Sequence, residues 1–109
     1  MNPAMAAAAF MCISPGVIDG DSLRCGDGTR VRIWGIQAPE RHHAAGPAST
    51  RAMARIVRGH DLRCHRKDQD RYGRTVARCF IGLRDIAREM VRQGHAEDWP
   101  KFSKGFYAR

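Results

Sequence analysis

Two aspartates separated by one glycine form the first group of side chains that could carry chemistry. Asp19 and Asp21 flank Gly20 in the run VIDGDSL, directly after a short apolar stretch that predicts a strand. At the bend after such a strand the two carboxylates would share a small space, and hard oxygen ligands of this kind suit calcium or magnesium. Asp and Gly are also the commonest turn formers, so this run alone favours an ordinary turn over a metal site.

The second group lies in the run RIWGIQAPE. Strand alternation places Arg32 on the face opposite to Val31 and Ile33. Pro39 ends the strand because its nitrogen cannot donate to the ladder, and Glu40 follows directly. Taken alone, this run favours a surface arginine and a solvated glutamate.

The third group is the run DRYGR, in which Tyr72 lies between Arg71 and Arg74 at a predicted tight turn. Arginine presents a planar fork of donors that matches phosphate oxygens in pairs, and a tyrosine ring can stack on a nucleotide. The competing interpretation is a simple basic hairpin tip.

The charge balance favours a polyanionic partner. Nineteen Lys and Arg face 11 Asp and Glu, which gives a net charge of +8 and an isoelectric point near 10.2. Almost all of the positive charge is arginine. A basic domain of this size favours nucleic acid first and an anionic membrane surface second, and the alternative is an ordinary solvated surface.

The length of 109 residues suits one domain and is too short for two. This domain is expected to span residues 12–109. Residues 1–11 are expected to be disordered or derived from a signal sequence, although they lack the basic segment that begins a signal peptide. No apolar run reaches the roughly 18 residues needed to cross a bilayer, so no membrane partner is expected.

Periodicity and turn residues predict a mainly β fold with helices. Strands are expected at residues 12–18, 22–25, 30–36, 61–67 and 74–81. One helix is expected to run from a cap at Ser49 or Thr50 to residue 58, and a second from a cap at Asp85 to Gly94. Five short strands with an intervening helix match a five-stranded Greek-key barrel of the OB-fold type, with a small α+β sheet as the fallback.

The four cysteines fall into two pairs. Cys64 and Cys79 lie symmetrically about the turn in the third run, so a hairpin closed there would place them opposite one another, within reach of a disulfide. Cys12 and Cys25 bracket the first run more loosely. Two such pairs indicate an oxidising compartment, periplasmic or extracellular. The alternative is four small buried thiols in the cytoplasm.

Taken in order, the runs VIDGDSL, RIWGIQAPE and DRYGR resemble the three signature segments of the staphylococcal nuclease family, with a predicted helix between the second and third. The run DIAREMVRQG resembles the family's helix after the last barrel strand. The similarity covers roughly residues 12–107. It implies the same OB-type barrel with two helices, and the family's third helix only in truncated form because the sequence stops soon after Tyr107.

The resemblance implies a metal site in the first two runs. Asp21 matches the directly coordinating calcium carboxylate, Asp19 a carboxylate that acts partly through water, and the carbonyl of Ala38 a main-chain ligand. Gln37 stands where the family usually has a second coordinating aspartate. An amide oxygen binds calcium but adds no negative charge, so weakened Ca2+ binding is expected. Magnesium and manganese are alternative ions.

The resemblance also implies roles in phosphate chemistry. Arg32 and Arg74 match the two arginines that clamp the reacting phosphate, and Glu40 matches the acid beside the attacking water. Arg71 and Tyr72 match side chains near the terminal phosphate of the nucleotide. Fixed guanidinium groups and a divalent ion stabilise the charge that an attacked phosphodiester gains, and a carboxylate can orient the water.

These features lead to three hypotheses about function. The first is a monomeric, calcium-dependent nuclease that hydrolyses DNA and RNA with little sequence preference, because phosphate contacts carry little sequence information. The second is a nucleic-acid-binding module of the same family that has lost turnover through Gln37. The third is a structural or protein-interaction domain that reuses the fold, for which Arg32 and Arg74 would be dispensable.

Overall fold

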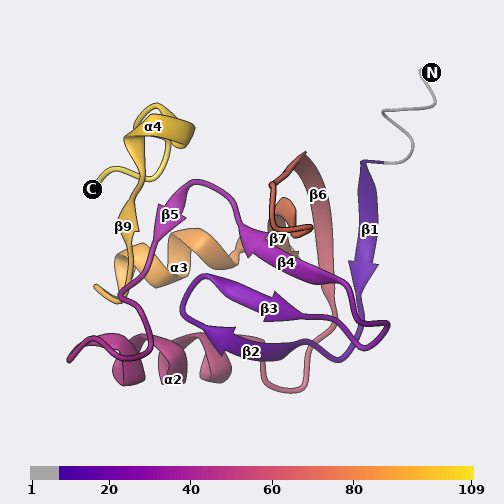
Figure 1. Ribbon diagram of the computed structural model, residues 1–109, viewed down its shortest axis with the longest axis horizontal. Helices are drawn as coiled ribbons and strands as arrows, with labels where there is room; N and C mark the ends of the chain where they lie inside the picture. The colour runs from indigo at the N-terminus through magenta and orange to yellow at the C-terminus, as the bar shows by residue number, and fades with distance from the viewer. Residues whose placement is uncertain (1–7) are drawn as a thin grey trace.

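The computed structural model describes residues 8–109 and shows a curled, mixed β-sheet with helices packed on it (Figure 1). The strand order is β1-β6-β7-β4-β3-β2. The bounds are Ala9–Cys12 for β1, Gly16–Asp19 for β2, Ser22–Arg24 for β3, Arg30–Ile33 for β4, Leu62–Gln69 for β6 and Thr75–Ile81 for β7. Strands β4 and β7 run parallel, and the other neighbours in this order are antiparallel. This architecture confirms the expected mainly β fold of the OB type.

The first predicted strand is in fact two strands, β1 and β2, which lie at opposite edges of the sheet. At the break between them Ser14 has a φ of 49°, and its N–H donates to Asp61 Oδ1 at 2.9 Å. Strand β1 pairs with β6 and strand β2 pairs with β3, so one short stretch of chain belongs to both edges of the sheet. The sheet therefore curls toward a barrel.

The N-terminal boundary differs from the one expected. The sequence predicts a disordered or signal-derived segment over residues 1–11, whereas the structure pairs residues 9–11 with β6, from Ala9 opposite His65 to Met11 opposite Arg63. The alanine run that leads into these residues gives no strand signal, and the backbone hydrogen bonds to β6 form the strand instead. The rest of that expected segment, residues 1–7, lies outside the described residues.

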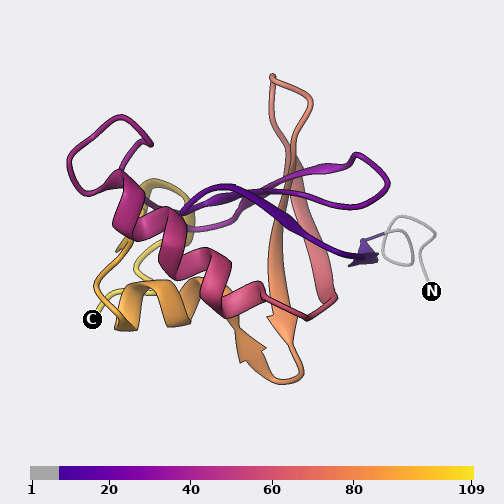
Figure 2. The ribbon, with the colours of Figure 1, turned by 90° about the horizontal axis from the view of Figure 1, so that it is seen from below.

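Three helices and three short strands complete the described part of the chain. Their bounds are Gly46–Val57 for α2, Ile86–Arg92 for α3, Pro100–Ser103 for α4, Ile36–Gln37 for β5, Arg84–Asp85 for β8 and Glu97–Asp98 for β9. Helix α2 packs along β2 and also contacts α3 (Figure 2). None of the helices in residues 8–109 has the length and apolarity needed to cross a membrane.

Helix α2 begins before the expected cap. It starts at Gly46 with Pro47 in its first turn, and neither Ser49 nor Thr50 is the cap. A proline in the first turn of a helix is already held at a helical φ and needs no donor there. The hydroxyl of Ser49 donates instead to the carbonyl of His95 at 2.8 Å, which ties α2 to the segment after α3. The expected cap of α3 is confirmed, since Asp85 Oδ1 accepts the N–H of Ala87 at 3.0 Å.

The strand expected at residues 30–36 breaks at Gly35, which has a φ of 83°. A Cβ at this position would lie 2.9 Å from Cε2 of Tyr107, so both the conformation and the space require glycine. The chain leaves β4 here and forms β5, which pairs with β9. The C-terminal segment, for which the sequence predicts no periodicity, therefore packs against this corner.

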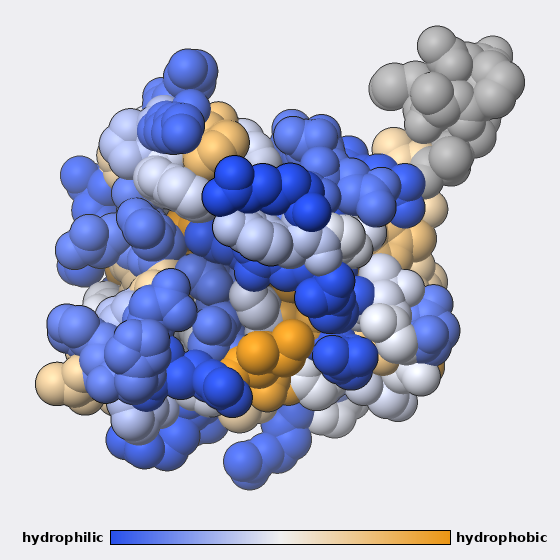
Figure 3. All heavy atoms as spheres, in the orientation of Figure 1, coloured by the Kyte–Doolittle hydropathy of each residue, from blue (hydrophilic) through white to orange (hydrophobic). Residues whose placement is uncertain are grey.

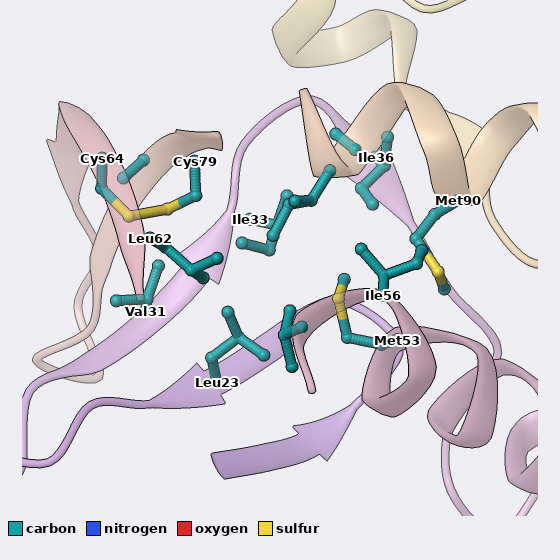
Figure 4. Packing of buried hydrophobic residues seen from close by; sticks show 14 of the residues in the cluster. Leu23, Val31, Ile33, Ile36, Met53, Ile56, Leu62, Cys64, Cys79 and Met90 are labelled. Carbon is teal, nitrogen blue, oxygen red and sulfur yellow. A yellow bond between two sulfur atoms is a disulfide. The ribbon is translucent and has the colours of Figure 1, made fainter. Parts of the chain in front are cut away.

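The core fills the space between the sheet and the helices (Figure 4). Alternate residues of the strands point inward, and Met53 and Ile56 of α2 meet them from the other side. Both predicted disulfides are present. Cys64 and Cys79 face each other in the β6–β7 register and are bonded, and Cys12 is bonded to Cys25. All four cysteines are buried.

Tyr107 fastens the C-terminal segment to the core. Its side chain is 1% exposed, its hydroxyl donates to Asp85 Oδ2 at 2.7 Å, and its N–H donates to Asp98 Oδ1 at 3.0 Å. Burial, together with the charge of Asp85, raises the pKa of Tyr107 well above its ordinary value. The neutral phenol is therefore the form that the folded protein stabilises.

Tyr107→Phe is expected to lower the free energy of unfolding by about 1.5–3 kcal/mol, the usual range for a hydrogen bond to a charged group. Because the folded pKa is raised, the tyrosine's contribution is present below the ordinary value of 10.0 and declines as the pH rises above it. Urea unfolding at pH 7 and pH 10.5 measures both effects. The exposed Tyr72→Phe is the matched control, and equal losses in the two variants would contradict the role of Tyr107.

Candidate functional site

Arg32 projects from β4, where it is paired with Ser22 of β3 and lies beside Val76 of β7. Its Nη1 donates to the carbonyls of Ile33 at 2.7 Å and Ile36 at 2.9 Å, which both belong to the corner at Gly35. The β4–β5 break therefore creates the acceptors that hold this guanidinium. Arg32 is fixed by the backbone before any ligand arrives.

Asp21 is the acidic partner of Arg32. Its Oδ2 lies 3.4 Å from Nη2 of Arg32, and both side chains are 11% exposed. The same Oδ2 accepts the N–H of Ala38 at 2.8 Å, and Oδ1 accepts the hydroxyl of Ser22 at 3.3 Å. Asp19 Oδ1 accepts the N–H of Asp21 at 3.2 Å, after a register shift at the end of β2. The two aspartates predicted from the sequence are therefore adjacent, and Asp21 contacts three different strands or loops.

The pKa of Asp21 is raised to about 6, mainly by burial and to a smaller extent by the neighbouring Asp19, against the opposing effects of Arg32 and the Ala38 hydrogen bond. The ionised carboxylate is thus incompletely compensated by the protein alone. A cation bound beside Asp21 would stabilise the ionised form.

Asp21→Asn is expected to raise the free energy of unfolding at pH 7 in the presence of a chelator, by at most about 3 kcal/mol. The folded protein holds the proton of Asp21 more tightly than the unfolded chain does, so wild-type stability falls as the pH rises from the ordinary value of 3.8 to about 6. The difference in unfolding free energy between the variant and the wild type should vanish below pH 4. Urea titrations from pH 3.5 to 7.5 measure this difference, with the exposed Glu97→Gln as control. A variant that is less stable at every pH would contradict the expectation.

The β6–β7 turn positions Arg74 through Asp70. Asp70 Oδ1 accepts the N–H groups of Tyr72 at 3.0 Å and Arg74 at 2.9 Å, and Oδ2 accepts Nε of Arg74 at 2.7 Å. Although burial opposes the effect, the hydrogen bonds from Arg74 lower the pKa of Asp70. Nη1 of Arg74 also lies 3.4 Å from the hydroxyl of Ser22. Ser22 therefore connects Arg74 to Asp21, the partner of Arg32.

Arg32 and Arg74 open onto one cleft of about 490 Å³. Arg71 and Tyr72 also line it, and Nη2 of Arg71 donates to the tyrosine hydroxyl at 2.9 Å. The guanidinium of Arg32 lies 5.1 Å from the ring centroid of Trp99. The sequence assigned no site role to four further lining residues, which come from three separate segments: Trp34, Lys67, Trp99 and Lys101. The cleft thus combines several cations with aromatic walls.

Glu40 lies in a different hollow. Gln37, Ala38 and Glu40 line a second depression of about 500 Å³ together with His43 and His95. The side chains of Gln37 and Glu40 are exposed. The structure therefore brings Asp19, Asp21, Arg32 and Arg74 together, with Arg71 and Tyr72 at the same cleft, and it places Glu40 and Gln37 on the neighbouring hollow. Ala38 connects the two areas because its N–H binds Asp21.

The loop that carries Glu40 packs closely against the backbone of Gly46 at the start of α2. A Cβ at residue 46 would lie 2.0 Å from the carbonyl oxygen of Glu40 and 2.8 Å from that of Arg41. The N–H of His43 also donates to the Glu40 carbonyl at 2.9 Å. This close approach of the loop to the start of α2 is a tertiary feature that no local sequence pattern predicts.

The donor set for a metal ion is small. Within residues 8–109, no three His, Cys, Asp or Glu side chains are grouped closely enough to hold an ion. The adjacent carboxylates of Asp19 and Asp21 offer hard oxygen atoms, and the burial that raises the pKa of Asp21 disfavours its ionised form unless a cation lies beside it. These residues fit a weakly held calcium ion better than a soft transition metal.

The surface around these elements is strongly polar. Most of the face shown in Figure 3 is hydrophilic, with a small hydrophobic area near its centre. The net charge of +8 is carried mainly by exposed arginines. A surface of this kind attracts polyanions over distances of about 10 Å at moderate ionic strength.

Comparison with known proteins gives consistent matches. An uncharacterized endonuclease of Haemophilus influenzae is 35% identical over 91 residues, which are 80% of this chain and 51% of that protein. Protein ParB of Escherichia coli is 33% identical over 92 residues, which are 73% of this chain and 52% of that protein. A probable staphylococcal-like nuclease, CAN1, of Oryza sativa subsp. japonica is 33% identical over 67 residues, which are 62% of this chain and 20% of that protein.

The chain spans about half the length of the first two of these relatives. The model of the family described as "Staphylococcal nuclease homologue" matches residues 30–105, which is more than half of the chain. This segment contains Arg32 and Arg74, the β6–β7 hairpin and the corner at Gly35. The chain therefore belongs to the staphylococcal nuclease homologue family.

Proposed function

We propose that this protein is a calcium-dependent nuclease that hydrolyses phosphodiester bonds of DNA and RNA with little sequence preference. The observation that carries the proposal is the pair of guanidinium groups, Arg32 and Arg74, at one cleft. Each is already bound to a carboxylate, and Ser22 lies between those two ion pairs. Preorganised donors of this kind stabilise charge that develops on a phosphate in the transition state.

Each site residue has a role in this proposal. Arg32 and Arg74 bind the equatorial oxygens of the scissile phosphate, and Arg71 and Tyr72 bind a terminal phosphate beside them. Calcium is held by the acidic pair Asp19 and Asp21 and by the neighbouring residues Gln37 and Ala38, with magnesium and manganese as alternative ions. When bound, the ion supplies Lewis-acid polarisation of a phosphoryl oxygen. Glu40 orients the attacking water. It lies two residues after Ala38, whose N–H donates to the carboxylate of Asp21.

The direct test is digestion of single-stranded DNA and of RNA by the purified protein with calcium, with magnesium, with manganese and with a chelator. Cleavage that requires calcium and shows the same rate on substrates of different sequence is the expected result. Absence of metal-dependent cleavage with all three ions would remove the nuclease proposal.

The second candidate is a binding module of the same family without turnover, and the position of Gln37 favours it. The side chain of Gln37 is exposed and uncharged on β5, so the cation pocket lacks a third carboxylate. This candidate expects salt-dependent binding of nucleic acid without hydrolysis under any of the metal conditions.

Gln37→Asp is expected to tighten calcium binding about tenfold, because one more carboxylate adds negative charge to the pocket. If the natural protein is a retuned nuclease, its cleavage rate at low calcium should rise as well. Calorimetric titration with calcium in the presence of a nucleotide bisphosphate measures the affinity. Gln37→Asn is the matched control, and an unchanged affinity in Gln37→Asp would place this side chain outside the cation site.

The compartment proposed is oxidising, periplasmic or extracellular, and the protein is proposed to act as a monomer. The two buried disulfides support the first point, because such bonds are rare in the reducing cytoplasm. Non-reducing mass spectrometry and light scattering of the protein from its native source test these two points.

A further inference from the structure

The outer face of the β6–β7 hairpin carries a second group of cationic side chains, which the proposed function does not use. On β7, Arg78 and Phe80 alternate with buried residues and so point away from the core. On β6, His65 lies opposite Arg78 and Arg63 lies opposite Phe80. Figure 2 shows that this hairpin is long and crosses much of the molecule.

Aromatic rings hold these arginines in place. The guanidinium carbon of Arg63 lies 5.0 Å from the ring centroid of Phe80, and that of Arg78 lies 5.1 Å from the same ring and 4.7 Å from Phe106. The guanidinium carbon of Arg88 lies 5.2 Å from the ring centroid of Phe106. We call these five residues the arginine–aromatic strip. Cations held over rings have already lost part of their rotamer freedom, so binding a phosphate costs less entropy.

The strip continues into the cleft. Phe106 contacts Trp34 with the ring centroids 6.0 Å apart, and Nζ of Lys67 lies 4.7 Å from the ring of Trp34. Both Trp34 and Lys67 line the cleft that contains the paired arginines. A strand rises about 3.3 Å per residue, so Arg63 lies roughly 13 Å along β6 from Lys67, about four phosphate spacings of a stacked strand.

The positive charge of the strip is only partly balanced. Arg78 pairs with Asp85 at 3.1 Å. Arg63 and Arg88 instead donate to the carbonyls of Gly82 and Phe106, and neither forms an ion pair with any residue in the described range 8–109. Phe106 is 45% exposed. Uncompensated cations beside an exposed ring are the features that surfaces for single-stranded nucleic acid combine.

We propose that the arginine–aromatic strip binds the part of a single-stranded polynucleotide that extends beyond the cleft. Its arginines bind successive phosphates, and unpaired bases stack on Phe106 and on the guanidinium planes. In a duplex the bases are paired and stacked inside, so a single strand alone uses both kinds of contact. The inference rests on the proposed function, because the strip guides the strand that the cleft cleaves.

Binding without cleavage tests the phosphate contacts. Fluorescence anisotropy in a chelator compares labelled thymidine oligonucleotides of 4 and 16 nucleotides. Arg63→Ala/Arg88→Ala is expected to raise the Kd of the 16-mer about tenfold, to reduce its salt slope by about 1.4, and to leave the Kd of the 4-mer unchanged. Arg51→Ala/Arg55→Ala, on the exposed face of α2, is the matched control. Equal 16-mer affinities in the two double variants would overturn the proposal.

A 16-mer of abasic nucleotides tests the stacking contacts. It keeps the phosphates and removes the bases, so the wild type should bind it about tenfold more weakly than the thymidine 16-mer. Phe106→Leu, which keeps an apolar side chain on Trp34, should weaken binding of the thymidine 16-mer and leave the abasic 16-mer unaffected. Equal wild-type affinity for the two polymers, or for a polyglutamate of matched charge, would overturn the stacking role and indicate a general anion-binding surface.

Cleavage of the 4-mer with calcium separates this inference from the nuclease proposal. If the wild type cleaves the 4-mer and the strip variants keep full affinity for the 16-mer, the strip proposal fails and the nuclease proposal stands. If the strip variants lose 16-mer affinity while no oligonucleotide is cleaved with any metal, the strip is a binding surface and the nuclease proposal fails.

Discussion

Replacement of Arg74 by alanine is expected to lower the rate of calcium-dependent phosphodiester cleavage about 100- to 1000-fold, the usual cost of removing one preorganised electrostatic donor. Asp70 and Ser22 hold the guanidinium at the hairpin tip before substrate arrives. Stabilisation of the developing phosphate charge therefore needs no reorganisation of this side chain. The measurement is kcat/KM on single-stranded DNA, with thermal unfolding to verify that the barrel remains folded.

Two further variants make this result specific. Arg74→Lys keeps the charge but loses the planar pair of donors, so it should recover only part of the activity. Arg51→Ala removes an exposed arginine on α2 and should retain wild-type cleavage. Full activity of Arg74→Ala would exclude the clamp role. Arg32→Ala is a less selective test, because it also leaves the buried Asp21 without its ion-pair partner.

The double variant Cys64→Ala/Cys79→Ala is expected to lose about 3 kcal/mol of unfolding free energy. Without the bond, the unfolded chain regains the entropy that closing a loop of about 15 residues removes. The bond joins residues separated by 15 positions, across the strands that carry Arg74 at their tip. Both cysteines are fully buried, so the smaller alanines also leave unfilled space in the core. Denaturant unfolding under non-reducing conditions measures the loss.

A second double variant, Cys12→Ala/Cys25→Ala, is the comparison for the first, because it opens a loop of similar separation, 13 positions. The two losses should be of similar size, and the wild type treated with a reductant should lose both. If Cys64→Ala/Cys79→Ala unfolds at the same denaturant concentration as the non-reduced wild type, the bond does not contribute to stability and the argument for an oxidising compartment weakens.

Features fixed by neighbouring residues could be predicted from the sequence. The alternation of strand residues placed Val31 and Ile33 inward and Arg32 outward, and the structure confirms both directions. The symmetry of Cys64 and Cys79 about a short turn determined their pairing. The Asp85 cap followed from its own position before an apolar stripe. In each case the decisive interaction joins residues within one strand, one hairpin or one helical turn.

Features that join distant segments could not be predicted in this way. Residues 9–11, which follow an alanine run, form a strand because β6, more than 50 residues later, supplies their hydrogen bonds. The loop with Glu40 approaches the start of α2 closely because Gly46 has no Cβ, and Glu40 lines the hollow beside the cleft of Arg32. The aromatic wall of that cleft includes Trp99 from a segment without periodicity.

The sequence by itself thus determined which chemical groups this protein carries, and in which short runs, because side-chain types and local spacing are written in the chain. The tertiary structure alone decided which of these groups share a cleft and which are charge-compensated. Asp21 shows the difference. Its position after a predicted strand was evident, but its raised pKa arises from burial between Ser22, Arg32 and Ala38, which only folding brings together.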